Sequence, residues 1–175
     1  AELWPGDNSM FTQINRYRQL SEDAGIGFTL PESIELIERP PEHIHSLHAA
    51  LDSKEHVQER RKLLTEIKGP AVLELGSGSG SLLRLIGTEC SGVNLLVGVE
   101  FSPHFFNSTA DRLTDIPEGQ NKPTSVFLVR ADITQMNINP RRFDTVILSS
   151  ILHEIKSYYS TEKVKNLLQN IRFGL

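Results

Sequence analysis

The chain has 175 residues, 38% of them hydrophobic, which is enough for one hydrophobic core and therefore one principal domain. The chain has 18 lysines and arginines and 22 aspartates and glutamates. The resulting net charge of -4 excludes an overall positive electrostatic field that would attract a polyanion such as nucleic acid. The single cysteine, Cys90, excludes an intrachain disulfide and a multi-cysteine metal cluster, as is typical of a reducing compartment. Without a long apolar run or a signal-peptide pattern, we expect a cytoplasmic protein with no membrane partner.

The first 40 residues contain prolines and glycines that interrupt every periodic pattern, so we interpret them as a loosely ordered arm. Within the arm, residues 14–20 fit one helix. Arg16, Tyr17 and Arg18 on that helix form a weak basic and aromatic footprint for nucleic acid, and a solvated helix face is the preferred interpretation. The sequence therefore gives no strong nucleic-acid signal.

Residues 42–68 have a helical pattern that Asp52 and Ser53 can divide into two helices. Gly69 and Pro70 end this region, because glycine adopts the left-handed conformation of a helix stop and proline cannot continue a helix. We assign residues 1–69 to an N-terminal arm and helical segment, and residues 70–175 to the main domain. The apolar positions recur at three-, four- and seven-residue intervals: Leu47, Leu51, Val57, Leu64 and Ile67.

The same helical region carries a group of potential metal ligands, namely His43, His45, His48, Asp52 and His56. On a continuous helix the last four would share a broad face, and imidazole is a good ligand for zinc or iron. However, their spacing matches no recognised ligand pattern, and histidines on a charged helix are usually solvated. We therefore expect no metal site.

Beyond residue 70, short apolar runs alternate with helical stretches and turn residues. The runs cover residues 71–75, 95–100, 126–130 and 144–149, as expected for strands buried on both faces of a parallel sheet. Helices are predicted after the glycine-rich turn that follows residue 75, from Ser102 and Pro103 onward, and over residues 161–173. This β-α-β alternation predicts an α/β fold.

The strongest motif is the turn that follows the first predicted strand, where Glu74 precedes glycines at 76, 78 and 80. Glycines at alternate positions let the backbone turn sharply and approach a ligand closely, whereas a flexible linker would not sit between a buried strand and a helix. A dinucleotide fingerprint, Gly-x-Gly-x-x-Gly, would need glycine at position 81, which is Ser81. The pattern instead resembles the first motif of class I S-adenosylmethionine-dependent methyltransferases, an acidic residue followed by x-Gly-x-Gly-x-Gly. The resemblance implies that Glu74, Gly76, Ser77, Gly78 and Gly80 contribute to cofactor binding.

The second predicted strand ends at Glu100 and Phe101, which we add to the candidate cofactor-binding residues. A carboxylate offers two acceptor oxygens, which suits the paired hydroxyl groups of a ribose. Nicotinamide enzymes place an acid in a similar position, and a carboxylate close to a helix N-terminus is also favoured by the helix dipole alone. Glu100 therefore indicates adenosine binding more strongly than it indicates methyl transfer.

Asp132 and Ile133 follow the end of the third predicted strand. At the matching position, the family uses an aspartate to accept a hydrogen bond from the adenine amino group, and the following backbone N–H meets a ring nitrogen. The resemblance therefore implies that Asp132 and Ile133 bind adenine. An isolated Asp could simply cap a turn, but three acidic strand ends in this order are less easily explained in that way.

The fourth predicted strand runs into Ser149, Leu152, His153 and Glu154, which resemble the Leu-His-His region of many small-molecule methyltransferases, with Glu154 in place of the second histidine. In an open α/β sheet the ligand crevice lies beyond the carboxyl ends of the strands, so Ser149 is expected near the reactive end of the cofactor. His153 and Glu154 are the candidate catalytic residues. His153 is either a base for the acceptor or a histidine that packs locally, and both interpretations stay open.

Taken together, residues 71–154 resemble the first four strands of the Rossmann-like methyltransferase fold, a parallel-rich sheet with helices on both faces. The resemblance implies methyl transfer with S-adenosylmethionine as cofactor. Because the family continues with a fifth strand and a hairpin, we expect that the sheet is truncated before its fifth strand. Either the remainder of a longer polypeptide or a second chain would then complete it and cover the edge of residues 146–148.

The acceptor is predicted only by class. The motifs associated with methylation of nucleic-acid bases are absent after the fourth strand, as is the Glu-x-x-Glu-His-His metal motif of small-RNA methyltransferases. A small molecule or a protein side chain is therefore the preferred acceptor. Two alternatives remain at this point: a nicotinamide-dependent oxidoreductase and a non-catalytic module with the methyltransferase fold.

Overall fold

A computed structural model describes residues 3–4, 50, 52–114, 116, 123–134, 136 and 142–174. The strands are β1 (Leu3–Trp4), β2 (Ala71–Leu75), β3 (Leu95–Glu100), β4 (Ser125–Arg130) and β5 (Thr145–Ile147). The helices are α3 (Lys54–Leu63), α4 (Ser81–Glu89), α5 (Pro103–Thr114), α6 (Leu152–Tyr158) and α7 (Thr161–Gly174), and a 3-10 turn, η1 (Leu64–Glu66), follows α3.

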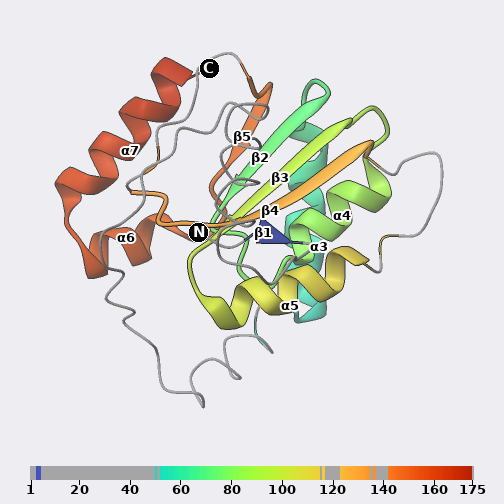
Figure 1. The fold of residues 1–175 in the computed structure, drawn as a ribbon, viewed down its shortest axis with the longest axis horizontal. Coiled ribbons are helices and arrows are strands. Elements are labelled where there is room, and N and C mark those ends of the chain that lie inside the picture. Colours follow the sequence, from blue (N-terminus) through green and yellow to red (C-terminus); the bar gives the residue numbers. More distant parts are fainter. Residues whose placement is uncertain are drawn as a thin grey trace.

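The five strands form one sheet in the order β1-β4-β3-β2-β5 (Figure 1). The pairs β2-β3, β3-β4 and β2-β5 are parallel. Among the described strands, only the two-residue β1 runs antiparallel, with Trp4 opposite Leu128 on β4. The parallel pairing follows from the connections, because each strand returns to the same edge of the sheet after a crossover. The predicted α/β architecture is confirmed.

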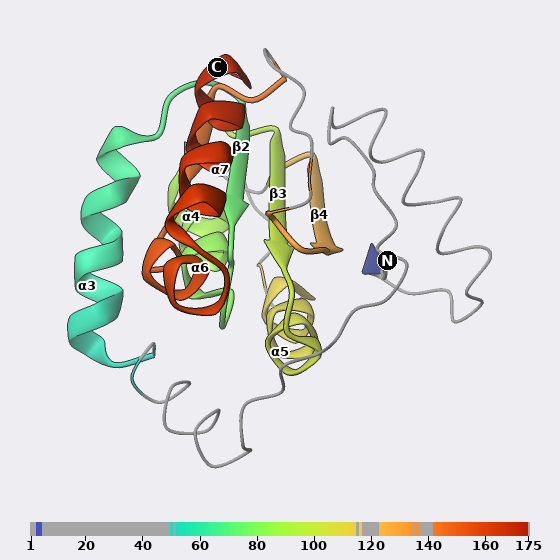
Figure 2. The ribbon, with the colours of Figure 1, turned by 90° about the vertical axis from the view of Figure 1, so that its left-hand side faces the viewer.

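Helices cover both faces of the sheet, because the strand side chains are apolar on both sides. Leu73 and Val97 face a core formed with α6 and α7, whereas Val72 and Leu96 face a core formed with α4 and α5. Figure 2, viewed from the side of α6 and α7, places these two helices in front of the sheet. The alternation along each strand follows the two-residue period of a β-strand. As a result, even-numbered residues of β2, including Glu74, point toward the α4 side.

The second part of the helical region expected over residues 42–68 forms α3, which begins just after Asp52 and Ser53. Ser53 is the N-cap of α3, and its hydroxyl accepts from the His56 N–H at 3.3 Å. A serine at this position satisfies one of the unpaired N–H groups of the first helical turn. Gly69, with φ +73°, then reverses the chain into β2.

The fourth parallel strand is shorter than the predicted range of residues 144–149. Only residues 145–147 pair with β2, in a register that ends with Ile147 opposite Glu74. The pairing stops there because β2 leads directly into the glycine-rich turn, and at the other end the Asp144 carboxylate accepts from the Ala71 N–H at 2.9 Å. In the part of the chain that the structure describes, β5 is the outermost strand on its side of the sheet.

None of the described helices combines the length and the apolar character that crossing a membrane would require.

Candidate cofactor site at the carboxyl ends of the strands

The glycine-rich turn joins β2 to α4 at the carboxyl edge of the sheet. Gly76, Gly78 and Gly80 all have positive φ, at +77°, +55° and +74°. This region is accessible to glycine at little cost, whereas other residues are strained there. The turn is anchored to β3, because the N–H groups of Gly76 and Ser77 both donate to the Val99 carbonyl, at 2.9 and 3.0 Å.

Two of these glycines are also required by close packing against neighbouring elements. A Cβ on Gly76 would lie 2.8 Å from the Ile151 side chain, and a Cβ on Gly80 would lie 2.6 Å from that of Thr109. The first contact holds the segment after β5 against the turn, and the second holds α5 against it. The spacing of the glycines therefore serves the assembly of three elements.

Glu74 and Ser77 place buried polar atoms beside the turn. Glu74 is 1% exposed and Ser77 is 2% exposed, and their atoms Oε2 and Oγ have no hydrogen-bond partner among the described residues. Burial raises the pKa of Glu74 to about 8, an effect that the charge of Arg60 opposes and that of Glu100 reinforces. Because buried polar groups are nearly always hydrogen-bonded, two such atoms at one turn indicate a missing partner.

Glu100, at the end of β3, is held by main-chain donors. Its Oε1 atom accepts from the N–H groups of Phe101 at 2.9 Å and Ser102 at 2.8 Å, and its Oε2 atom accepts from the Gly78 N–H at 2.7 Å. Burial raises the pKa of Glu100 to about 7, although these three hydrogen bonds oppose the shift. A carboxylate has about four acceptor positions, so one position on Oε2 stays available to a further donor. Phe101 follows directly, and its carbonyl accepts from Arg130 Nε at 3.3 Å.

Asp132 and Ile133 follow β4 at the same edge. Asp132 is 8% exposed, and its Oδ1 atom accepts from both the N–H and the hydroxyl of Thr134 at 2.8 Å. The hydroxyl of Tyr159 donates to the other oxygen, Oδ2, at 3.0 Å. The side chain of Ile133 belongs to the core beneath α6 and α7, so only its main chain is available to a ligand.

The segment after β5 completes the edge. Ser149 is half-buried in the loop, Ser150 adopts φ +59°, and Ile151 contacts the glycine-rich turn. Glu154 lies in the first turn of α6, and its charge contributes to the raised pKa of Glu100. His153 is exposed. The structure therefore brings the predicted residues of all four strand ends to one edge of the sheet.

A polar network over the outer side of the turn was not predicted. Arg60 of α3 is buried and donates to the Ser81 hydroxyl. Asp52 accepts from the Ser79 hydroxyl at 3.0 Å and forms an ion pair with Arg112 of α5. These contacts fasten α3 and α5 to the turn. The position of Arg60 three residues after Val57 and four before Leu64, on the apolar face of the helix, is the sequence signal that could have revealed its burial.

The family profile for a methyltransferase domain matches residues 73–175, which is more than half of the chain. The chain belongs to this family. Its structural neighbours are S-adenosylmethionine-dependent methyltransferases with the Rossmann-like class I fold, so the resemblance and the cofactor expected from the sequence are confirmed. No curated protein matches the chain.

Three solved structures illustrate the fold of this methyltransferase domain. A protein of Methanococcus maripaludis assigned as an S-adenosyl-L-methionine-dependent methyltransferase aligns with 85% of the chain at 12% identity and a TM-score of 0.58. An S-adenosylmethionine-dependent methyltransferase from Aquifex aeolicus aligns with 77% of the chain at 16% identity and a TM-score of 0.54. The glycopeptide N-methyltransferase MtfA aligns with 74% at 25% identity and a TM-score of 0.50. The chain spans 62%, 68% and 56% of these structures, respectively.

The histidine group considered as a metal site falls mostly outside the described residues, which include only Asp52 and His56 of the five. Asp52 is engaged by Ser79 and Arg112. Among the residues that the structure describes, no three histidine, cysteine or acidic side chains are arranged to hold a metal ion.

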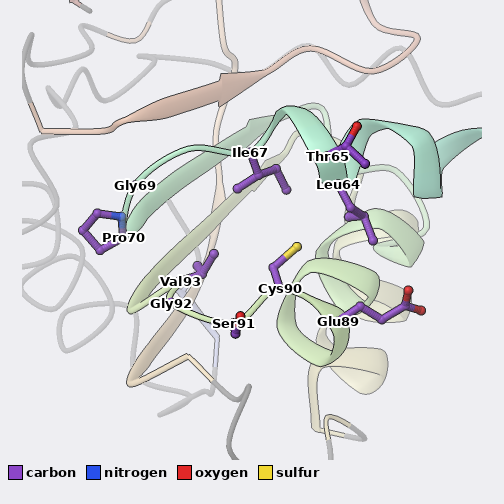
Figure 3. A pocket seen from close by; sticks show the side chains of 10 residues that line it. All are labelled: Leu64, Thr65, Ile67, Gly69, Pro70, Glu89, Cys90, Ser91, Gly92 and Val93. Carbon is purple, nitrogen blue, oxygen red and sulfur yellow. The ribbon is translucent and has the colours of Figure 1, made fainter.

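A hollow of about 530 Å³ lies at the opposite, amino-terminal edge of the sheet (Figure 3). It is formed where η1, the end of α4 and the loops before β2 and β3 meet, and Cys90 lines it. Burial raises the pKa of the Cys90 thiol, so this cysteine is not activated as a nucleophile. In open α/β sheets ligands bind beyond the carboxyl ends of the strands, and the catalytic site of the domain is therefore expected at the other edge.

Proposed function

We propose that this methyltransferase domain binds S-adenosylmethionine at the carboxyl edge of its sheet and transfers the methyl group to a small molecule or a protein side chain. One observation carries the proposal: Glu74, Glu100 and Asp132 are buried carboxyl groups at the ends of three adjacent parallel strands, around a turn of three positive-φ glycines. Burying three acidic groups so close together is costly unless a ligand with matching donors uses them.

The unpartnered polar atoms fit one end of this cofactor. Oε2 of Glu74 and Oγ of Ser77 are buried without a partner among the described residues. The ammonium group of the methionine end carries three donors, and an adjacent positive charge would favour the ionised form of Glu74. The charge of Arg60 already favours the ionised form of Glu74. We therefore assign the methionine end to the β2 turn.

The adenosine end is assigned to the next two strand ends. Because Oε1 of Glu100 is occupied by two N–H groups, Oε2 is the atom that would accept a ribose hydroxyl. If Glu100 accepted hydrogen bonds from both ribose hydroxyls, one of the three main-chain N–H groups would have to give up its hydrogen bond to the carboxylate. Asp132 would accept from the adenine amino group and the Ile133 N–H would donate to the ring, with Phe101 between the two sites.

The cofactor, when bound, supplies an electrophilic methyl group that a nucleophile displaces in line. The contribution of the chain is to hold the reactants in line and to exclude water. Ser149 and the segment before α6 would border the reacting centre. His153 or Glu154 would accept the proton of an acceptor that must lose one, and Glu154 is the less exposed of the two.

Acceptors other than nucleic-acid bases are supported by the residues after β5, which lack the base-methylation motif. MtfA, by its name, methylates a glycopeptide. A nicotinamide-dependent oxidoreductase is disfavoured because Ser81 stands where the dinucleotide fingerprint needs glycine, and its hydroxyl is bonded to Arg60.

Thermal unfolding in the presence of S-adenosylhomocysteine or NAD⁺ tests the cofactor assignment. A ligand present at about 100 times its Kd stabilises the folded state by about 2.7 kcal/mol, which corresponds to a rise of roughly 5 to 10 °C in Tm for a chain of this size. We expect this shift with S-adenosylhomocysteine and none with NAD⁺. A shift with NAD⁺ alone would contradict the proposal and favour the oxidoreductase.

A further inference from the structure

Tyr159 reaches the predicted adenine site from a distant part of the sequence. It follows the last residue of α6, where its N–H donates to the Ile155 carbonyl at 2.9 Å. Its hydroxyl donates to Oδ2 of Asp132 at 3.0 Å, across 27 residues of sequence. The segment between α6 and α7 is therefore joined to the end of β4 through the side chain of Tyr159.

The two oxygens of Asp132 are held by different elements. Thr134 binds Oδ1 through its N–H and hydroxyl, both at 2.8 Å, and both donors belong to the same turn as Asp132. Tyr159 binds Oδ2 from outside that turn. A carboxylate held by donors at both oxygens cannot rotate freely, so the hydroxyl of Tyr159 sets the plane in which Oδ2 presents its acceptor positions.

Tyr159 stays protonated over the whole neutral pH range, as this role requires. Burial, the charge of Asp132 and their hydrogen bond raise the pKa of Tyr159 to about 12, so the hydroxyl stays a donor. The tyrosine is 47% exposed, whereas Asp132 is 8% exposed. Because about half of the tyrosine is exposed, its hydrogen bond to the buried carboxylate contributes to its position alongside apolar burial.

We propose that Tyr159 is a positioning residue for adenine recognition: it orients the Asp132 carboxylate toward the amino group of the base. The inference rests on the proposed function, because it assigns a role within the same cofactor site. The alternative is that Tyr159 is a tether, which only holds the helices α6 and α7 against the sheet. A tether affects stability, whereas a positioning residue affects discrimination between adenine and a base that lacks the amino group.

The test compares the binding of S-adenosylhomocysteine with that of its purine analogue, in which hydrogen replaces the amino group. Titration calorimetry is expected to show that Tyr159→Phe binds S-adenosylhomocysteine about 10-fold more weakly than the parent, because Asp132 loses the donor that orients it and its own hydrogen bond to the adenine amino group is weakened. Binding of the purine analogue should change by less than about 2-fold, since it does not use Asp132 as an acceptor. The preference for adenine over purine should therefore fall in the variant.

Ser157→Ala is the matched control, because it also removes a hydroxyl group, one that donates only to the His153 carbonyl of α6. It should keep the adenine preference of the parent. If the parent binds S-adenosylhomocysteine and Tyr159→Phe keeps the same preference for adenine over purine, the inference about Tyr159 is overturned, even if the Tm falls. The proposed function would then still stand. No binding by the parent would overturn the proposed function and the inference with it.

Discussion

Replacing Glu100 with glutamine is expected to weaken the binding of S-adenosylhomocysteine by about 100-fold, which corresponds to the upper part of the range for a hydrogen bond to a charged group. Glutamine has the same shape, but only one of its two terminal atoms accepts hydrogen bonds. If its oxygen takes the place of Oε1 beside Phe101 and Ser102, its amide group faces the Gly78 N–H and cannot accept from a ribose hydroxyl. Both the turn and the ligand lose an acceptor.

Calorimetric titration of the parent and the variant measures this loss. The control is Glu89→Gln, which makes the same chemical change at an exposed carboxylate paired with Arg61 near the hollow at the opposite edge. The control should bind like the parent. If Glu100→Gln also bound within 2-fold of the parent, Glu100 would have no role in cofactor binding.

Replacing Glu74 with glutamine is expected to flatten the pH dependence of stability. The pKa of Glu74 is raised to about 8 in the folded protein, mainly by burial, so the folded state holds a proton that the unfolded chain has released above about pH 5. The associated stabilisation is complete at low pH and is lost as the pH rises through 8. Between pH 5 and 8 this loss is on the order of 3 kcal/mol for one such group.

Urea unfolding at several pH values between 5 and 8.5 tests this expectation. The parent should lose stability as the pH rises, with Glu100 adding a loss of the same sign as the pH passes about 7. The charges that face Glu74 are those of Arg60 on α3 and Glu100 on β3, and both remain in the variant. Glu66→Gln, at an exposed position on η1, should follow the parent. Parallel profiles for Glu74→Gln and the parent would show that Glu74 does not titrate in this range.

The sequence was sufficient to predict most elements of the main domain, because their signals are local, although the helix α6 (Leu152–Tyr158) was not predicted. Gly69 and Pro70 end one helix, and the apolar runs of β2 and β3 match the predicted ranges residue for residue. The carboxyl ends of parallel strands necessarily meet at one edge, so the proximity of Glu74, Glu100 and Asp132 followed from the strand assignment alone. The roles of these residues in binding remain predictions.

The contacts between distant elements could not be predicted in the same way. The position of Arg60 on the apolar face of its helix indicates burial, but its hydrogen bond to Ser81 depends on how α3 packs against α4. The bond between Tyr159 and Asp132 depends on the path of the chain between α6 and α7. The fourth strand was predicted too long because its limit is set by the neighbouring turn of β2 and not by its own composition.

A crystal structure of this chain with S-adenosylhomocysteine is the most direct test of the central claim that acidic strand ends and the glycine-rich turn form the cofactor site. We predict a ribose hydroxyl bonded to Glu100, the adenine amino group bonded to Asp132, and the ammonium group beside Glu74. A ligand bound at the amino-terminal edge, or an edge filled by side chains with Glu100 and Asp132 directed away from the ligand, would contradict the account.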